Sequence, residues 1–184
     1  MKLAKNYYFI TIFVLSIAGR LIPHPANMTP MISLALIAAA YCSRLIGLLT
    51  IAIAVLISDL LLAVIMGYPA FTLVSLFTYS GFITITFLGS LRTSNSKKSL
   101  LISTVFATCG FWLWTNLGVW LTTSMYPMNS LGLAACYTAA LPFLRNSLIG
   151  SLVWMVILAI FLKPRTANKN SFIPQFSPVQ SSNT

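Results

Sequence analysis

The sequence predicts an all-α membrane protein built as a bundle of six transmembrane helices. Hydrophobic residues make up 58% of the 184-residue chain and charged residues only 7%, whereas ordinary soluble domains carry about 25% charged residues. The apolar residues gather in runs close to the roughly 20 residues that a spanning helix needs. Most basic residues lie between these runs, as in loops at a membrane surface. Together these observations exclude an ordinary soluble domain.

The apolar runs place the helices within one transmembrane domain, residues 1–163. We expect them at about residues 6–22, 29–43, 45–66, 70–91, 99–121 and 146–163. A break is required near Arg44, because one helix over residues 29–66 would be about 57 Å long, too long for a bilayer. Residues 133–141 are apolar but too short to span, which predicts a re-entrant or interfacial helix before the last span. The polar residues 164–184 predict a disordered cytoplasmic tail.

The distribution of basic residues predicts how this bundle is oriented. If the N-terminus is cytoplasmic, nine of the eleven Lys and Arg residues fall on cytoplasmic segments, where such residues are enriched. We therefore expect a multi-pass protein of the bacterial inner (cytoplasmic) membrane with both termini in the cytoplasm. Residues 2–18 could also pass for a secretory signal, but the apolar run continues through Ile22 and favours a retained helix. The net charge of +10 then indicates contact with anionic lipid and no nucleic acid.

The connection from Arg20 to Pro30 is a polar segment between two apolar runs. It contains Arg20, Asn27 and His24, which is the only histidine of the chain, and its prolines restrict the backbone. The segment is either the wall of a binding pocket or a structural closure of the bundle. His24 has too few potential co-ligands for a metal site, so we expect neither a metal nor a cofactor here.

Asp59 is the only acidic residue and lies midway along the third expected helix. A carboxylate at that depth costs a few kcal/mol, so it should face the protein interior and have a partner. It could bind a ligand, ion or proton, form a structural pair with Arg20 or Arg145, or stay protonated in a helix interface. The two arginines could instead bind an anionic solute or anchor helix ends to lipid headgroups.

The fifth expected helix carries Trp112, Asn116 and Trp120 at intervals of four residues, so the three share a face. Two indoles around an amide suit a planar solute, although an interfacial aromatic belt is the alternative. The chain lacks nucleotide-binding and hydrolase motifs. One acid and one histidine offer almost no candidates for acid–base chemistry. We therefore expect no enzymatic activity, and any ATPase that drives transport would be a separate polypeptide.

These residues resemble a bacterial family of small multispanning proteins grouped with the substrate-binding S components of energy-coupling-factor (ECF) transporters. The resemblance spans about residues 6–163 and rests on the motifs Arg20-Leu-x-Pro-His-Pro-x-Asn27-x-Thr-Pro30, Ser58-Asp59-Leu-Leu, Asn116-Leu-Gly-Val-Trp120, Cys136-Tyr137 and Pro142-Phe-x-Arg145-Asn146. It implies six helices, cytoplasmic termini and an external substrate pocket. The pocket residues that it implies are Arg20, His24, Asn27, Asp59, Asn116, Trp120, Tyr137, Arg145 and Asn146.

The resemblance also implies partners and a function. The partners would be a small-molecule solute, the lipid bilayer, and a separate ECF coupling subunit with its ATPases. The expected function is uptake of a small solute, such as a vitamin, precursor or metabolite, and the two external arginines favour an anionic one. The sequence departs from the pattern at Ala26 and lacks an Ala-x-x-x-Ala pair in the first helix. The alternative is a membrane scaffold or assembly protein without transport activity.

Overall fold

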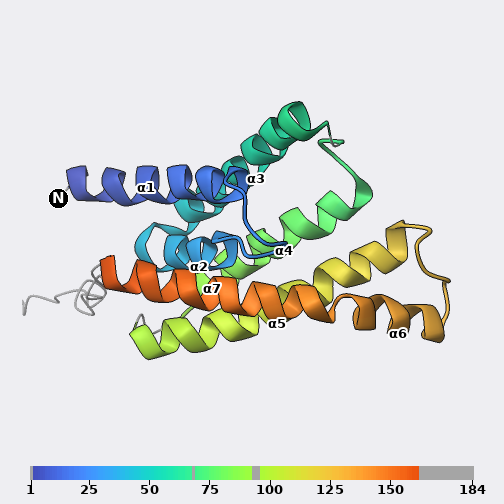
Figure 1. Cartoon of the computed structure of the whole chain (residues 1–184). Helices are drawn as coiled ribbons and strands as arrows, with labels where there is room; N and C mark the ends of the chain where they lie inside the picture. Colours follow the sequence, from blue (N-terminus) through green and yellow to red (C-terminus); the bar gives the residue numbers. More distant parts are fainter. Residues whose placement is uncertain (1, 68, 93–95, 162–184) are drawn as a thin grey trace, which may run out of the picture.

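The computed structural model describes residues 2–67, 69–92 and 96–161, with side chains from residue 8 onward. Over these residues the fold is all-α and has no strand. Figure 1 shows the helices, which are α1 (Lys2–Leu21), α2 (Met31–Tyr41), α3 (Arg44–Met66), α4 (Leu73–Ser90), α5 (Lys97–Thr122), α6 (Ser130–Ala139) and α7 (Leu141–Phe161). The expected tail, residues 164–184, lies outside the described residues.

Four of the helices, α3, α4, α5 and α7, are long and apolar enough to cross a membrane. The apolar part of α1 whose side chains are described, Tyr8–Leu21, is shorter, as are α2 and α6. Four such helices in one chain indicate a membrane protein. The finer expectation of six spans stays a prediction.

The short helix α2 forms the centre of the fold. It packs against α1, α3, α4, α5 and α7, and nine of its eleven residues are buried. Its sequence is apolar on every face, which is the pattern of a helix surrounded by others. Small residues let its neighbours approach closely: a Cβ at Gly47 of α3 would lie 3.1 Å from the backbone oxygen of Ala38, and a Cβ at Gly89 of α4 would lie 2.9 Å from the Cβ of Ala39.

The connections between helices follow from local sequence signals. The break required near Arg44 lies at Cys42 and Ser43, which are both extended, and α3 resumes directly afterwards. Helix α4 begins at Leu73, because Thr72 and Ser75 form a capping box around its first turn. Helix α6 lies immediately before α7, in the region where a re-entrant or interfacial helix was expected.

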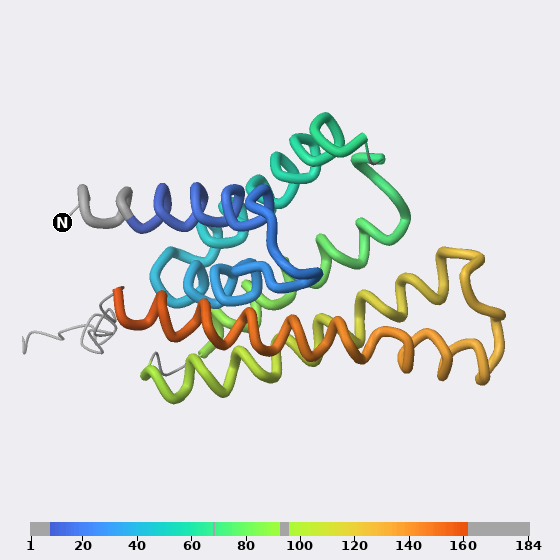
Figure 2. Tube along the Cα trace, in the orientation of Figure 1, coloured from blue at the N-terminus to red at the C-terminus, as the bar shows by residue number. Residues whose placement is uncertain are grey.

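The two ends of the molecule differ in the segments that they carry. Helix α1 begins, α7 ends and α5 begins at one end, on the left of Figure 1, whereas α6 and the end of α5 lie at the other. The connection after α1 runs into the middle of the molecule (Figure 2). This connection and the nearby helices form the candidate site.

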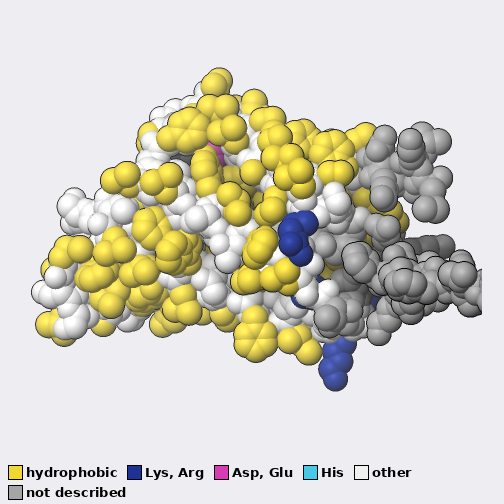
Figure 3. All heavy atoms as spheres, turned by 180° about the vertical axis from the view of Figure 1, so that it is seen from behind, with side chains coloured by type: hydrophobic (Ala, Val, Ile, Leu, Met, Phe, Trp, Pro, Cys, Tyr) yellow, Lys and Arg dark blue, Asp and Glu magenta, His cyan; other side chains and the backbone are white. Residues whose placement is uncertain are grey.

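The outer surface is largely apolar. Exposed large hydrophobic residues occur on all the long helices, and Val64 of α3 (85% exposed) and Phe106 of α5 (75% exposed) are among the most exposed. Figure 3 shows hydrophobic side chains over most of one face, with basic side chains gathered towards one end. Such a surface is stable in contact with lipid and would be an aggregation hazard in water.

Candidate functional site

Arg20 and Asp59 form an ion pair between the end of α1 and the C-terminal half of α3. A terminal guanidinium nitrogen (Nη2) of Arg20 lies 2.5 Å from Oδ1 of Asp59, and the two side chains are only 17% and 15% exposed. The other terminal nitrogen (Nη1) donates to Oγ of Ser58 over 3.0 Å. Of the two arginines that the sequence offered to Asp59, the structure selects Arg20.

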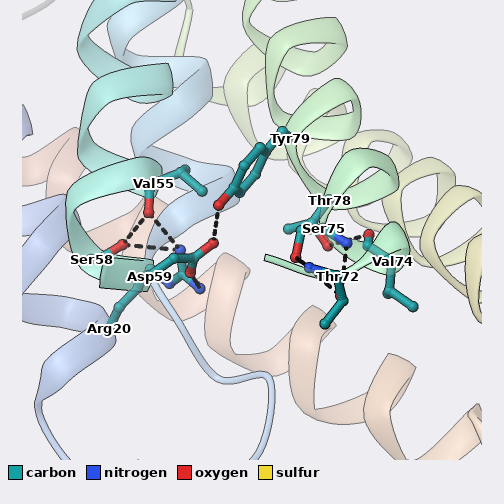
Figure 4. A network of polar contacts seen from close by, with 9 residues as sticks. All are labelled: Arg20, Val55, Ser58, Asp59, Thr72, Val74, Ser75, Thr78 and Tyr79. Atoms are coloured by element: carbon teal, nitrogen blue, oxygen red, sulfur yellow. Dashed lines mark hydrogen bonds and ion pairs between the residues drawn. The ribbon is translucent and has the colours of Figure 1, made fainter. Parts of the chain in front are cut away.

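A third helix completes this network. The hydroxyl of Tyr79 on α4 donates to Oδ2 of Asp59 over 2.6 Å, so both carboxylate oxygens have partners. Figure 4 shows the three side chains converging from α1, α3 and α4. A hydrogen bond and an ion pair compensate for the removal of the charge from water. The network therefore joins three helices through groups that are costly to leave unpaired.

A separate cavity of about 390 Å³ lies among α2, α4, α5, α6, α7 and the connection after α1. Its aromatic lining comes from Phe82, Phe111, Trp112, Tyr126 and Phe143. Apart from these aromatic residues, the polar side chains that line it are neutral amides and hydroxyls, namely Asn27, Thr29, Thr115, Asn116, Ser147 and Ser151. In the part of the chain that the structure describes, no charged side chain lines it. Its volume falls within the range of about 300–1,000 Å³ that is typical of small-molecule sites.

Several polar groups in this cavity are available to a ligand. Within the described residues, the side chains of Asn27, Thr29, Tyr126 and Ser147 form no hydrogen bond with the protein. The amide nitrogen of Asn116 donates to the backbone oxygen of Trp112 over 2.8 Å, which leaves the side-chain oxygen to accept. These groups could donate to and accept from a small polar molecule, whereas the aromatic rings could pack on its apolar faces.

The connection of residues 22–30 is held against α7, and this positions Asn27. The amide nitrogen of Asn146 donates to the backbone oxygen of Ala26 over 3.1 Å. Gly150 of α7 allows close approach, since a Cβ there would lie 2.8 Å from the Cα of Met28. Asn27 itself has a φ of 64°, a left-handed conformation that Asn tolerates better than most residues. The backbone therefore places the Asn27 side chain at the cavity.

Two of the nine candidate residues, Asn27 and Asn116, line the cavity. Arg20 and Asp59 lie together in the ion pair and are not among the lining residues. Asn146 supports the cavity indirectly through its bond to the connection. The structure thus separates the charged candidates from the neutral ones.

The remaining candidates lie outside the cavity. His24 is exposed, and its Nδ1 lies 2.5 Å from the backbone oxygen of Ile22. Trp120 donates to the backbone oxygen of Pro127, and Tyr137 donates to that of Leu113. Arg145 is exposed and has no polar partner among the described residues. His24 and Trp120 thus bond to backbone oxygens close by in the chain, whereas Tyr137 of α6 bonds to the backbone of α5.

The cavity also includes residues that do not stand out in the sequence. On α5, Phe111 and Thr115 join Asn116, and on α7, Ser147 and Ser151 face the same space. The last two residues are four positions apart, so they share a helical face. That spacing was a usable signal, but isolated Ser and Thr residues are common in membrane helices and bond to their own backbone.

The described residues contain no cluster of three or more His, Cys, Asp or Glu residues that could hold a metal ion. The indole nitrogen (Nε1) of Trp112 donates to the backbone oxygen of Ala140 at the junction of α6 and α7 over 2.9 Å. This bond fixes the indole as one wall of the cavity. The arrangement is suited to binding a small molecule between fixed rings and neutral hydrogen-bonding groups.

This helical architecture with a small cavity among the helices defines a membrane protein with a candidate small-molecule site. The chain belongs to a family of unknown function, DUF6580, whose model matches residues 2–171. No curated protein matches the chain, and no solved structure matches it.

Proposed function

We propose that this protein is the solute-binding subunit of a membrane uptake system, similar to the S components of ECF transporters. The observation that carries the proposal is the cavity of about 390 Å³, with four polar side chains that lack protein partners within the described residues. If the connection after α1 only closed the helical bundle, side chains that filled this space would make the fold more stable. An open, polar-lined cavity is therefore better explained by a ligand.

The chemistry of the lining supports an uncharged solute with a ring. Neutral amide and hydroxyl groups face the cavity together with several aromatic rings. Arg20, which suggested an anionic solute in the sequence, is neutralised by Asp59, and Arg145 is not a lining residue. The proposal therefore departs from the expectation of an anion, because a buried anion without a cationic partner would be strongly disfavoured.

The proposed orientation places both termini in the cytoplasm of a bacterial inner membrane. Arg44, Arg92, Lys97 and Lys98 belong to the end of the molecule where α3 and α5 begin, and this enrichment supports a cytoplasmic end. The cavity and α6 would then lie towards the external side. The proposed partners are a separate coupling subunit and its ATPases, and the protein itself would not be an enzyme.

The test is native mass spectrometry of the full chain purified in detergent from bacterial membranes. A retained small molecule is expected on the wild-type protein. Asn27→Gly should abolish its retention, since it removes the cavity side chain but suits the φ of 64° at that position. Ala26→Gly is the matched control in the same connection and should retain the molecule.

Two outcomes would contradict this proposal. The first is the absence of any retained molecule from protein that is folded and monodisperse. The second is equal retention by wild type and the Asn27→Gly variant. Either result would favour the alternative function, a membrane scaffold or assembly protein.

A further inference from the structure

A second hollow, which shares the lining residue Phe111 with the cavity, lies between α4 and α5. It has a volume of about 560 Å³ and is lined mainly by apolar and small side chains, including Gly81, Leu88, Phe106, Ala107 and Gly110. A Cβ at Gly110 would meet nothing within 4 Å, so this glycine leaves open space. We call this hollow the α4–α5 groove.

One end of the α4–α5 groove is basic. Arg92, just after α4, is one of its lining residues, and its Nη2 donates to Oγ of Ser99 over 2.8 Å. Arg44 lies at the same end of α4, where its Nε donates to Oγ of Ser90 over 3.1 Å. The only acidic residue of the whole chain is Asp59. These arginines therefore have no acidic side chain to balance them locally.

The start of α5 adds two further positive charges. Lys97 and Lys98 are exposed in its first turn, which contains no acidic residue. A helix N-terminus carries a partial positive charge and favours anions. Two lysines there are electrostatically unfavourable unless an anion lies nearby. We call Arg44, Arg92, Lys97 and Lys98 the basic cluster.

We propose that the α4–α5 groove binds an acyl chain of an anionic phospholipid, whose phosphate is held by the basic cluster. The groove is apolar along its length and basic at one end, which is the polarity of a phospholipid. Basic pockets between transmembrane helices commonly bind anionic headgroups.

Two substitutions separate the acyl-chain part of the site from its headgroup part. Gly110→Leu fills the groove from a position where an added side chain meets open space. Arg92→Gln removes one positive charge at the basic end. Val64→Phe is the control, because it adds apolar bulk at a residue of α3 that is 85% exposed and does not line the groove.

The experiment titrates delipidated full-length protein in detergent with dioleoyl phosphatidylglycerol or dioleoyl phosphatidylcholine, and it follows bound lipid by native mass spectrometry. Wild type and Val64→Phe should bind phosphatidylglycerol more tightly than phosphatidylcholine. Arg92→Gln should weaken phosphatidylglycerol binding about five-fold. Gly110→Leu should weaken the binding of both lipids while the helical circular-dichroism signal stays unchanged.

Four results would overturn the proposal. The first is equal binding of the two lipids by wild type. The second is unchanged phosphatidylglycerol binding by Gly110→Leu. The third comes from thermal unfolding of wild type: inorganic phosphate raises the midpoint temperature as much as phosphatidylglycerol does. This result would assign the basic cluster to a free anion. The fourth is a wild-type dimer that Gly110→Leu dissociates, since the groove would then bind a second copy of the chain.

Discussion

Arg20 at the end of α1 and Asp59 in α3 form an ion pair of 2.5 Å in a largely apolar protein. Because Asp59 also accepts from Tyr79 of α4, the pair joins three helices. Removing one member leaves the other charged in a poorly solvated position. The energetic consequences can be measured residue by residue.

The ion pair predicts strongly coupled mutational effects. Asp59→Asn should lower the free energy of unfolding by about 3 kcal/mol, because it leaves the Arg20 guanidinium without its counter-charge. The double variant Arg20→Gln with Asp59→Asn should lose less than the sum of the two single changes. Thermal unfolding in detergent, followed by tryptophan fluorescence, gives the three values. Arg145→Gln is the control, and additive losses would show that the two charges do not interact.

The Tyr79 hydroxyl predicts a smaller but specific loss. Tyr79→Phe removes a hydrogen bond to a carboxylate and should cost about 1.5–3 kcal/mol. Tyr126→Phe is the matched control, because the Tyr126 hydroxyl has no protein partner within the described residues. The same unfolding measurement compares the two variants. Equal midpoints for both would contradict the role of Tyr79 in the network.

The close contact between Gly150 and Met28 predicts that even one added methyl group disturbs the cavity wall. Gly150→Ala should destabilise the protein by about 1–3 kcal/mol, because its Cβ would overlap the backbone of the connection. Gly110→Ala should instead be neutral or stabilising by up to about 1 kcal/mol, since its Cβ meets open space and Ala favours helix. Opposite signs for the two glycines are expected in thermal unfolding. A neutral Gly150→Ala would show that the connection is loosely placed.

The bond between Asn146 and Ala26 predicts the accessibility of the cavity. Cys136 lines the cavity and is only 2% exposed, so a maleimide should label it slowly in a background of Cys42→Ser and Cys109→Ser. Asn146→Leu removes the bond from α7 to the connection and should increase the labelling rate several-fold. His24→Leu is the control in the same connection, since His24 bonds only locally. An unchanged rate in Asn146→Leu would mean that residues 22–30 do not cover the cavity.

Part of the candidate site could be read from the sequence. The need of Asp59 for a partner follows from the cost of a charge in lipid. The sequence offered Arg20 and Arg145 as structural partners, beside a bound ligand, ion or proton. Asn27 and Asn116 were identified because polar groups stand out against apolar runs. Arg20 and Asp59 were expected in the pocket, but they lie in the ion pair outside it. The sequence could not distinguish these two places, because a charge within the membrane is equally consistent with a structural pair and with a binding site.

The sequence by itself determined the helical class and the membrane character, because long apolar runs satisfy their backbone hydrogen bonds within lipid only as helices. Only the tertiary structure decided that α2 is central, that Arg20 is the partner of Asp59, and that the cavity is neutral. The physical reason is that apolar residues face both lipid and protein in a membrane helix. Hydropathy therefore shows where helices occur along the chain. Which helix faces pack together depends on where glycines allow close approach and where large side chains fill the space between helices.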